Sequence, residues 1–222
     1  MRKIVFIVSI LFSTLLVSAQ TAGNDGFYPG WYVGGNLGTS WLAGERIDNF
    51  SNNPDSRYSL GRNSGSMFRA EIGYNYSPVW GIRGFAGFTQ NHWPEATLYY
   101  KEVISFASKY VTGDVMMNIS NYLEGQNLAR SFDFLAFAGT GFHFRNRMTR
   151  NGAGLFSMIG RLGAQTNFIL NEYMDLKAIF ELNIVDDNYN GFEMGSKLDI
   201  MPALSVGLTY YIDFSRFQSY FK

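Results

Sequence analysis

The chain has 222 residues, enough for one domain, and its 18 basic and 18 acidic side chains cancel. Without a basic excess there is no electrostatic footprint for nucleic acid, and without cysteine there are no disulfides, thiol nucleophiles or thiolate zinc sites. Aromatic residues make up 17% of the chain and charged residues 16%. This charged fraction is too small for the surface of a soluble protein of this size.

Residues 1–19 have the features of a secretory signal peptide. Arg2 and Lys3 form a basic start, Ile4 to Val17 is an apolar run, and Ser18-Ala19 supplies small residues for cleavage. The run is shorter than the roughly twenty apolar residues of a membrane-spanning helix. We therefore expect residues 1–19 to be removed on export, and residues 20–222 to form a single domain with a slightly acidic net charge and no basic patch.

Alternating apolar and polar residues run through the rest of the chain. Since successive side chains of a strand point to opposite sides, this period of two predicts β-strands. No apolar run after residue 19 reaches the length of a spanning helix. The predicted strands are about 30–42, 66–77, 81–91, 109–120, 131–144, 156–170, 175–184 and 203–214.

The clearest pair of strands lies in residues 156–184, on either side of a short connection at 171–174. Each alternating run is about ten to twelve residues long, beyond the usual five or six of a soluble strand. That length matches the roughly nine to eleven residues that cross a bilayer at a tilt. The hairpin therefore predicts membrane-spanning strands.

The connections alternate in length along the chain. Shorter ones at 77–80, 121–130 and 171–174 separate long ones at 43–65, 92–108, 145–155 and 186–200. Short periplasmic turns with long outer loops are typical of transmembrane barrels. The fold class predicted is all-β, an eight-stranded antiparallel up-and-down transmembrane β-barrel. Ten strands stay possible if residues 96–108 pair with another segment.

The polar faces of the predicted strands carry charged side chains interleaved with glycines. A soluble lipocalin-like barrel would turn its apolar faces inward, but the export signal and the shortage of charge favour a barrel with the polar faces inside. Because eight strands enclose a space that side chains can fill, we expect an ion-paired, plugged lumen. A proton or ion pathway is the alternative. The predicted network is Arg69, Glu71, Arg83, Asp114, Arg161, Lys177 and Glu181.

Aromatic residues near the strand ends predict girdles at the two membrane interfaces. Trp31 and Trp41 stand at opposite ends of one apolar face. The predicted girdle residues are Trp31, Trp41, Tyr74, Tyr76 and Tyr210. The strand at 131–144 is less regular, because Leu135 and Phe137 stand among the polar residues of its inner face.

Three features of the sequence point to a known family. They are the signal peptide, alternating runs such as WYVGGNLGTSW and ALSVGLTYYIDF, and the aromatic last strand. Over residues 30–214 the sequence resembles the small eight-stranded outer-membrane β-barrel family, of the OmpA- and OmpX-like kind. The resemblance implies a location in the cell outer membrane among its lipids, and insertion by the barrel assembly machinery, which reads the terminal strand. Phe214 closes the alternation and residues 215–222 follow it. No motif specific to one function is shared.

Two features of the sequence are candidate sites, one for catalysis and one for calcium binding. Lipid A deacylases and palmitoyl transferases resemble this scaffold and need a base, for which only His92 and His143 are available, without a nucleophile at a supporting spacing. Residues 186–191, DDNYNG, match the first half of a calcium loop, but Lys197 replaces the bidentate Glu at the twelfth position. We expect a turn there, and neither a cofactor nor an enzyme.

The sequence thus predicts an outer-membrane barrel with a structural or interaction role through its extracellular loops. Two alternatives stay open. One is an accessory subunit of a larger outer-membrane complex with an envelope protein partner. The other is an enzyme that modifies lipid A in the outer leaflet.

Overall fold

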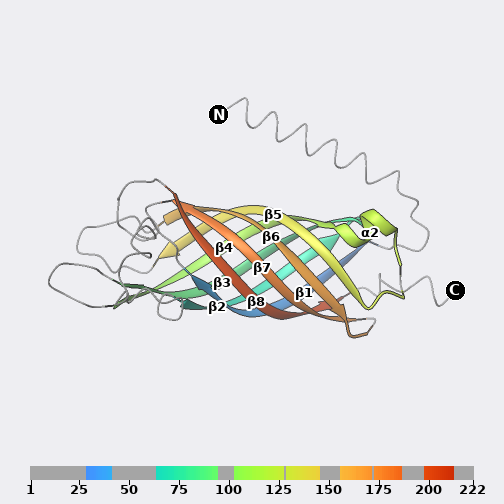
Figure 1. Ribbon diagram of the computed structural model, residues 1–222, viewed down its shortest axis with the longest axis horizontal. Coiled ribbons are helices and arrows are strands. Elements are labelled where there is room, and N and C mark those ends of the chain that lie inside the picture. Colours follow the sequence, from blue (N-terminus) through green and yellow to red (C-terminus); the bar gives the residue numbers. More distant parts are fainter. Residues whose placement is uncertain are drawn as a thin grey trace, which may run out of the picture.

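Eight antiparallel strands close into a barrel, with one short helix at its rim (Figure 1). The computed structural model describes residues 29–41, 64–94, 103–127, 129–145, 156–171, 173–186 and 198–212. The elements are β1 Gly30–Trp41, β2 Ser64–Asn75, β3 Trp80–Pro94, β4 Val103–Asn118, α2 Ile119–Glu124, β5 Phe132–Arg145, β6 Phe156–Ile169, β7 Met174–Asp186 and β8 Leu198–Tyr211. Each strand pairs with the next, and β1 pairs with β8, where Val33 faces Tyr210. The predicted fold class is confirmed.

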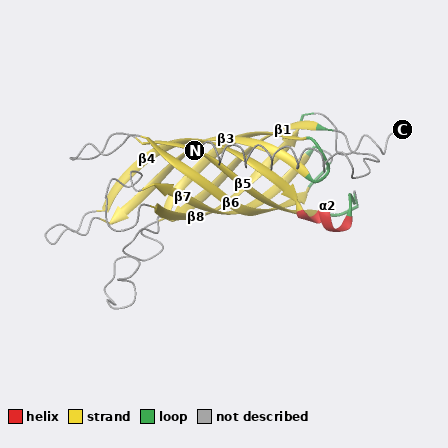
Figure 2. Ribbon diagram, turned by 90° about the horizontal axis from the view of Figure 1, so that it is seen from above, coloured by secondary structure: helices red, strands yellow, loops and turns green. Residues whose placement is uncertain are grey.

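The two ends of the barrel differ (Figures 1 and 2). At one end lie the turns 76–79 and 170–173, the connection 119–131 with α2, the start of β1 and the end of β8. We call this the short-turn end and the opposite one the long-loop end. In the described part of the chain, no helix is long and apolar enough to cross a membrane.

Three details of the prediction are wrong. The ten-strand alternative fails because residues 103–108 pair with β3 itself, Val103 facing Pro94, so that one hairpin is simply longer. The connection at 186–200 is shorter than predicted because β8 begins at Leu198, opposite Asp186. The strand expected to reach residue 120 ends at Asn118, whose side chain accepts a hydrogen bond from the Asn121 amide and caps α2. The signal peptide and Phe214 lie outside the described residues.

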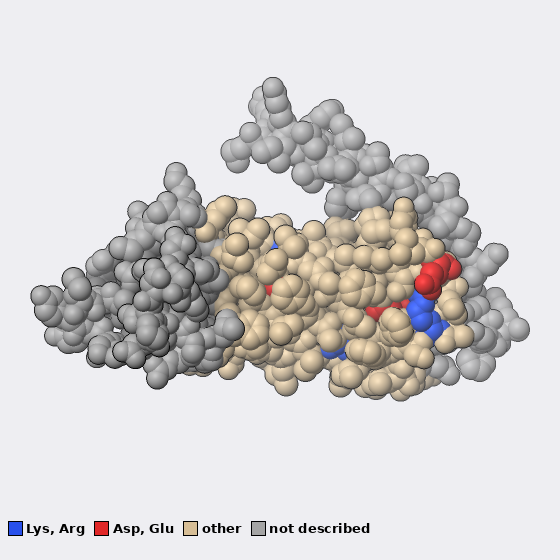
Figure 3. Space-filling view, in the orientation of Figure 1, with Lys and Arg blue, Asp and Glu red and all other residues tan. Residues whose placement is uncertain are grey.

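Side chains are distributed opposite to those of a soluble protein. Outward-facing Leu37 and Val206 are 62% and 60% exposed, whereas Arg69 and Lys177 are completely buried. In Figure 3 the visible wall is almost entirely uncharged, and basic and acidic side chains meet at the short-turn end. The predicted inner and outer faces are confirmed, including the inward positions of Leu135 and Phe137.

The glycines of the strands fall into two groups. A Cβ atom on an outward glycine would meet nothing closer than 3.7 Å, as at Gly84 and Gly113. A Cβ atom on an inward glycine would collide with a neighbouring strand or side chain. The inward group is Gly34, Gly38, Gly73, Gly81, Gly87, Gly139, Gly141, Gly163 and Gly207. Inward glycines therefore make room for the large side chains of the interior.

This difference predicts opposite effects for one substitution. Gly141→Ala places a methyl group against the Val111 carbonyl and within 2.6 Å of the Thr112 Cα, neither of which a side-chain rotation can relieve. We expect it to lower the free energy of unfolding by about 1–3 kcal/mol. Gly113→Ala, which has open space, should be neutral or stabilising by up to about 1 kcal/mol. Urea unfolding in lipid vesicles, followed by tryptophan fluorescence, measures both; equal effects would contradict the packing argument.

Candidate functional site

The seven charged residues predicted for the lumen come from β2, β3, β4, β6 and β7, and all point inward. Their orientation follows from strand alternation: Arg69 and Glu71 are two residues apart on β2, and Lys177 and Glu181 are four apart on β7. None of the seven side chains is more than 3% exposed. Charges so fully removed from water need partners, and the structure supplies them.

Five of the seven form one continuous chain of ion pairs. Arg83 Nε lies 2.9 Å from Asp114 Oδ2, and Arg161 Nη1 lies 3.1 Å from Asp114 Oδ1. The other end of Arg161 reaches Glu181, with Nη2 2.6 Å from Oε2. The same oxygen of Glu181 lies 2.8 Å from Arg69 Nη1. The chain links β3, β4, β6, β7 and β2, so it ties together strands on opposite sides of the barrel.

Lys177 and Glu71 form the remaining pair, again between β7 and β2. Glu71 also lies 3.4 Å from the side-chain amide of Asn36 on β1 and 3.4 Å from the Thr209 hydroxyl on β8. No other basic side chain among the described residues forms an ion pair with Glu71. In the described part of the chain, Lys177 is therefore the ion-pair partner of the Glu71 carboxylate.

Neutral side chains accept further hydrogen bonds from the arginines. Arg69 Nη2 donates to Ser205 Oγ at 2.9 Å, and Arg161 Nη1 donates to Thr112 Oγ1 at 2.6 Å. Arg83 Nη1 donates to the side chain of Gln165. These contacts favour a packed interior, because each guanidinium is held by groups from several strands.

Two inward phenylalanines belong to the network. The guanidinium carbons of Arg69, Arg83 and Arg161 lie 4.3, 4.6 and 4.9 Å from the ring centre of Phe85. Arg83 also lies 4.4 Å from the ring centre of Phe137. Cations are attracted to aromatic faces, most strongly where water is excluded. The predicted network did not include these two rings, although both stand among polar residues on the inner faces of their strands.

A polar cavity opens beside this interior at the short-turn end. Its lining is rich in side-chain amides, among them those of Asn75, Asn118, Asn121, Gln165 and Asn167. Tyr32, Met116 and Tyr211 line the cavity as well, and they form a buried cluster with Phe137 and Ile179. Gln165, which lines the cavity, also accepts a hydrogen bond from Arg83, so the cavity borders on the end of the ion-pair chain.

The geometry gives little support to the candidate catalytic and metal sites. His143 is 2% exposed and faces the interior, its Nδ1 3.2 Å from the Ser108 hydroxyl and its ring tilted against that of Tyr110, with 5.1 Å between the ring centres. His92 belongs to β3, and its side chain is not described. Among the described residues no group of three His, Asp or Glu side chains is placed to hold a metal ion. The calcium-like segment after Asp186 lies outside the described residues.

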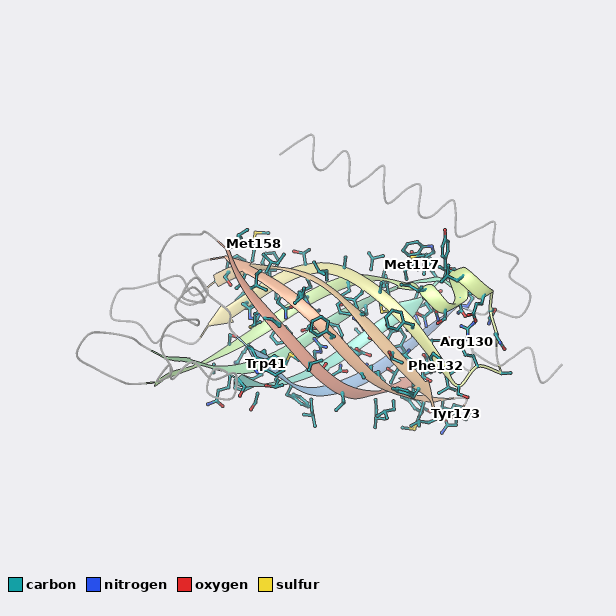
Figure 4. The ribbon with its side chains drawn as sticks, in the orientation of Figure 1. Trp41, Met117, Arg130, Phe132, Met158 and Tyr173 are labelled. Atoms are coloured by element: carbon teal, nitrogen blue, oxygen red, sulfur yellow. The ribbon has the colours of Figure 1, made fainter. Side chains whose placement is uncertain are left out.

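The predicted girdle residues lie near both ends of the barrel. Trp31, Tyr74 and Tyr210 stand at the short-turn end, where the rings of Trp31 and Tyr74 are 5.0 Å apart, and Tyr76 follows directly after β2. Trp41 stands at the long-loop end (Figure 4). An aromatic cluster that the prediction did not include lies at the same end. In it the ring centre of Phe156 is 4.9 Å from that of Phe142 and 5.6 Å from that of Phe144.

Comparisons with known proteins find likeness only among solved structures. No protein-family model matches the chain, and no characterised protein sequence does. Neisserial surface protein A shares 15% identity, with a TM-score of 0.49 over 82% of this chain and 98% of that one. Outer membrane protein OprG from Pseudomonas aeruginosa shares 12% identity, with a TM-score of 0.48 over 85% and 98%. The outer membrane enzyme PagL shares 12% identity, with a TM-score of 0.43 over 79% and 97%. The likeness is one of fold.

Proposed function

We propose that this protein is an integral outer-membrane barrel with a closed, ion-paired interior. The observation that carries the proposal is the distribution of side chains across the wall: the interior holds the buried charges, while large apolar side chains such as Leu37, Phe68 and Val206 are 56–62% exposed. Leaving one such side chain in water, compared with burying it, costs about 1.5–3 kcal/mol of free energy. Outer-membrane lipids around the wall remove that cost, and a closed barrel leaves no unpaired strand edge in the membrane.

The orientation follows from the connections. The short-turn end is the periplasmic end, as in other transmembrane barrels, and the long-loop end faces outward. Insertion is then the task of the barrel assembly machinery. The role is structural or one of interaction, through the connections at the long-loop end. Co-purification of a stoichiometric envelope protein after mild detergent extraction would move the assignment towards an accessory subunit of a larger complex.

A passive pore is not expected from this interior. The charged side chains in the middle of the lumen are at most 3% exposed, which leaves no water-filled path at their level. In planar lipid bilayers we expect the purified barrel to show no stable, large conductance, under conditions where a sixteen-stranded porin conducts. A reproducible open level from the folded protein would refute the closed interior and revive the ion pathway.

The lipid-modifying alternative gains no support from His143. A base that acts on outer-leaflet lipid has to reach the outside of the wall, and this ring faces the interior. We propose that the protein is not an enzyme. Incubation of the reconstituted barrel with lipid A tests this directly, since a changed acyl-chain content, lost in His143→Gln, would establish the enzyme instead.

A further inference from the structure

The helix α2 is fixed to the barrel through its polar side chains. Asn121 Nδ2 donates to the Pro78 carbonyl in the β2–β3 turn at 2.8 Å. Ser120 Oγ accepts a hydrogen bond from the Phe134 amide of β5 at 2.9 Å. Asn118 caps the first turn from the end of β4. Three connections around the helix therefore determine which of its sides faces the rim.

Arg130 holds the other end of α2 (Figure 4). Its guanidinium lies 2.9 Å from Glu124 Oε2 and 3.1 Å from Asp133 Oδ1, and it donates to Asn121 Oδ1 at 3.2 Å. It also reaches the carbonyls of Ser120 and Gly125, both at 3.5 Å. The Arg130 side chain is only 9% exposed. With both ends held in this way, the orientation of this short helix is set.

That orientation turns two of the three large apolar side chains of α2, those of Tyr122 and Leu123, away from the protein. Tyr122 is 64% exposed and Leu123 is 72% exposed, the largest fraction among the large hydrophobic residues that the structure describes. No residue of α2 is buried. The helix follows directly on β4, close to Met117 (Figure 4), and it is hydrogen-bonded to the amide of Phe134 on β5, which is itself 42% exposed. The apolar exterior of the wall therefore continues past the strand ends onto α2.

We propose that α2 lies in the headgroup region of the periplasmic leaflet, with Tyr122 and Leu123 inserted among the lipids, and so sets the depth of the barrel in the membrane. The inference rests on the proposed function. Tyrosine suits the boundary between headgroups and acyl chains because its ring is apolar and its hydroxyl is polar. Lipid is favoured over a protein partner because the two side chains extend the lipid-facing wall and make too small a patch for a stable protein interface. Beyond them, Glu124 and the exposed Asn127 mark the side in water.

The chain contains no cysteine, so one introduced cysteine gives a unique site for a fluorescent label. We would attach an environment-sensitive nitrobenzoxadiazole label to Leu123→Cys on α2. Two controls frame it: Val111→Cys, which faces outward from the wall and is 55% exposed, and Asn127→Cys, exposed on the same connection as α2. Each full-length variant is folded into vesicles of phosphatidylethanolamine and phosphatidylglycerol, and circular dichroism checks the barrel. Quenching is measured with aqueous iodide and with lipids that carry a nitroxide on the headgroup or deep in an acyl chain.

The expected pattern separates the three sites. The label at residue 111 is quenched most by the deep nitroxide, the label at 127 by iodide, and the label at 123 by the headgroup nitroxide, with iodide quenching several-fold weaker than at 127. If 123 behaves like 127 while 111 contacts lipid, the inference about α2 fails and the membrane barrel stands. If iodide quenches 111 as well, the proposed function fails. Protection of 123 from all three quenchers would mean a protein contact and would also overturn the assignment.

Discussion

Replacing Glu181 by Leu is expected to lower the free energy of unfolding by about 3–5 kcal/mol. Its carboxylate is the common partner of Arg69 and Arg161, at 2.8 and 2.6 Å. Arg161 keeps Asp114 after the substitution, but the completely buried Arg69 loses its ion pair and keeps neutral contacts, with the Ser205 hydroxyl and the Phe85 ring. An unpaired guanidinium in that position cannot recover its hydration. Reversible unfolding by urea in vesicles gives the difference.

The structure offers a matched control for Glu181→Leu. Glu124 also pairs with an arginine, at 2.9 Å, but its side chain is 70% exposed. Glu124→Leu should cost no more than about 1 kcal/mol, because water screens a surface pair. Adding Arg69→Met to Glu181→Leu removes the stranded charge and should restore part of the stability. Equal losses for the two glutamates would refute the view that burial makes the interior pairs important.

Lys177→Met is expected to lower the free energy of unfolding by a similar amount, about 3–5 kcal/mol. Here the charge left without its ion-pair partner is negative. The substitution removes the ion pair of the Glu71 carboxylate and leaves its hydrogen bonds, both at 3.4 Å, with Asn36 and Thr209. Lys109→Met is the control, since Lys109 is exposed near the long-loop end of β4. Its removal should change the free energy of unfolding little.

A double-mutant cycle identifies the cause of the Lys177→Met effect. If the loss comes from an isolated charge on Glu71, then Lys177→Met combined with Glu71→Leu should be more stable than Lys177→Met alone, because no charge stays behind. If the loss came from poorer packing of methionine, the second substitution would add to it. Additive losses would therefore contradict the assignment of this pair.

The faces of the strands were predictable because their cause is local. Residues alternate between the two sides of a strand whatever the strand pairs with, so the inward positions of Arg161 and Glu181 follow from the sequence around them. The same reasoning placed Leu135 and Phe137 on the inner face of β5, where an apolar residue among polar ones had appeared to be an irregularity. The apolar character of Phe137 is explained only by the guanidiniums of Arg83 and Arg161 over its ring, whereas Leu135 lines the cavity at the short-turn end.

The helix α2 shows why local patterns were insufficient at the rim. Residues 119–124 are too few for a helical period to be recognised, and the hydrogen bonds that hold them come from Pro78, Phe134 and Arg130. The predicted strands 81–91 and 109–120 stop short of the outer ends of β3 and β4 for a related reason. Pairing of Pro94 with Val103 depends on the partner strand and leaves no alternation of its own.

Alternation, charge content and the spacing of turns were thus enough to establish which residues face the interior of an eight-stranded barrel. The partners of the interior charges were decided by the closed sheet. Arg69 meets Glu181 and Lys177 meets Glu71 across 112 and 106 positions of the chain. The physical reason is that the tilt of the strands and the stagger between neighbours determine the depth of each side chain along the barrel axis, and both exist only once β1 has paired with β8.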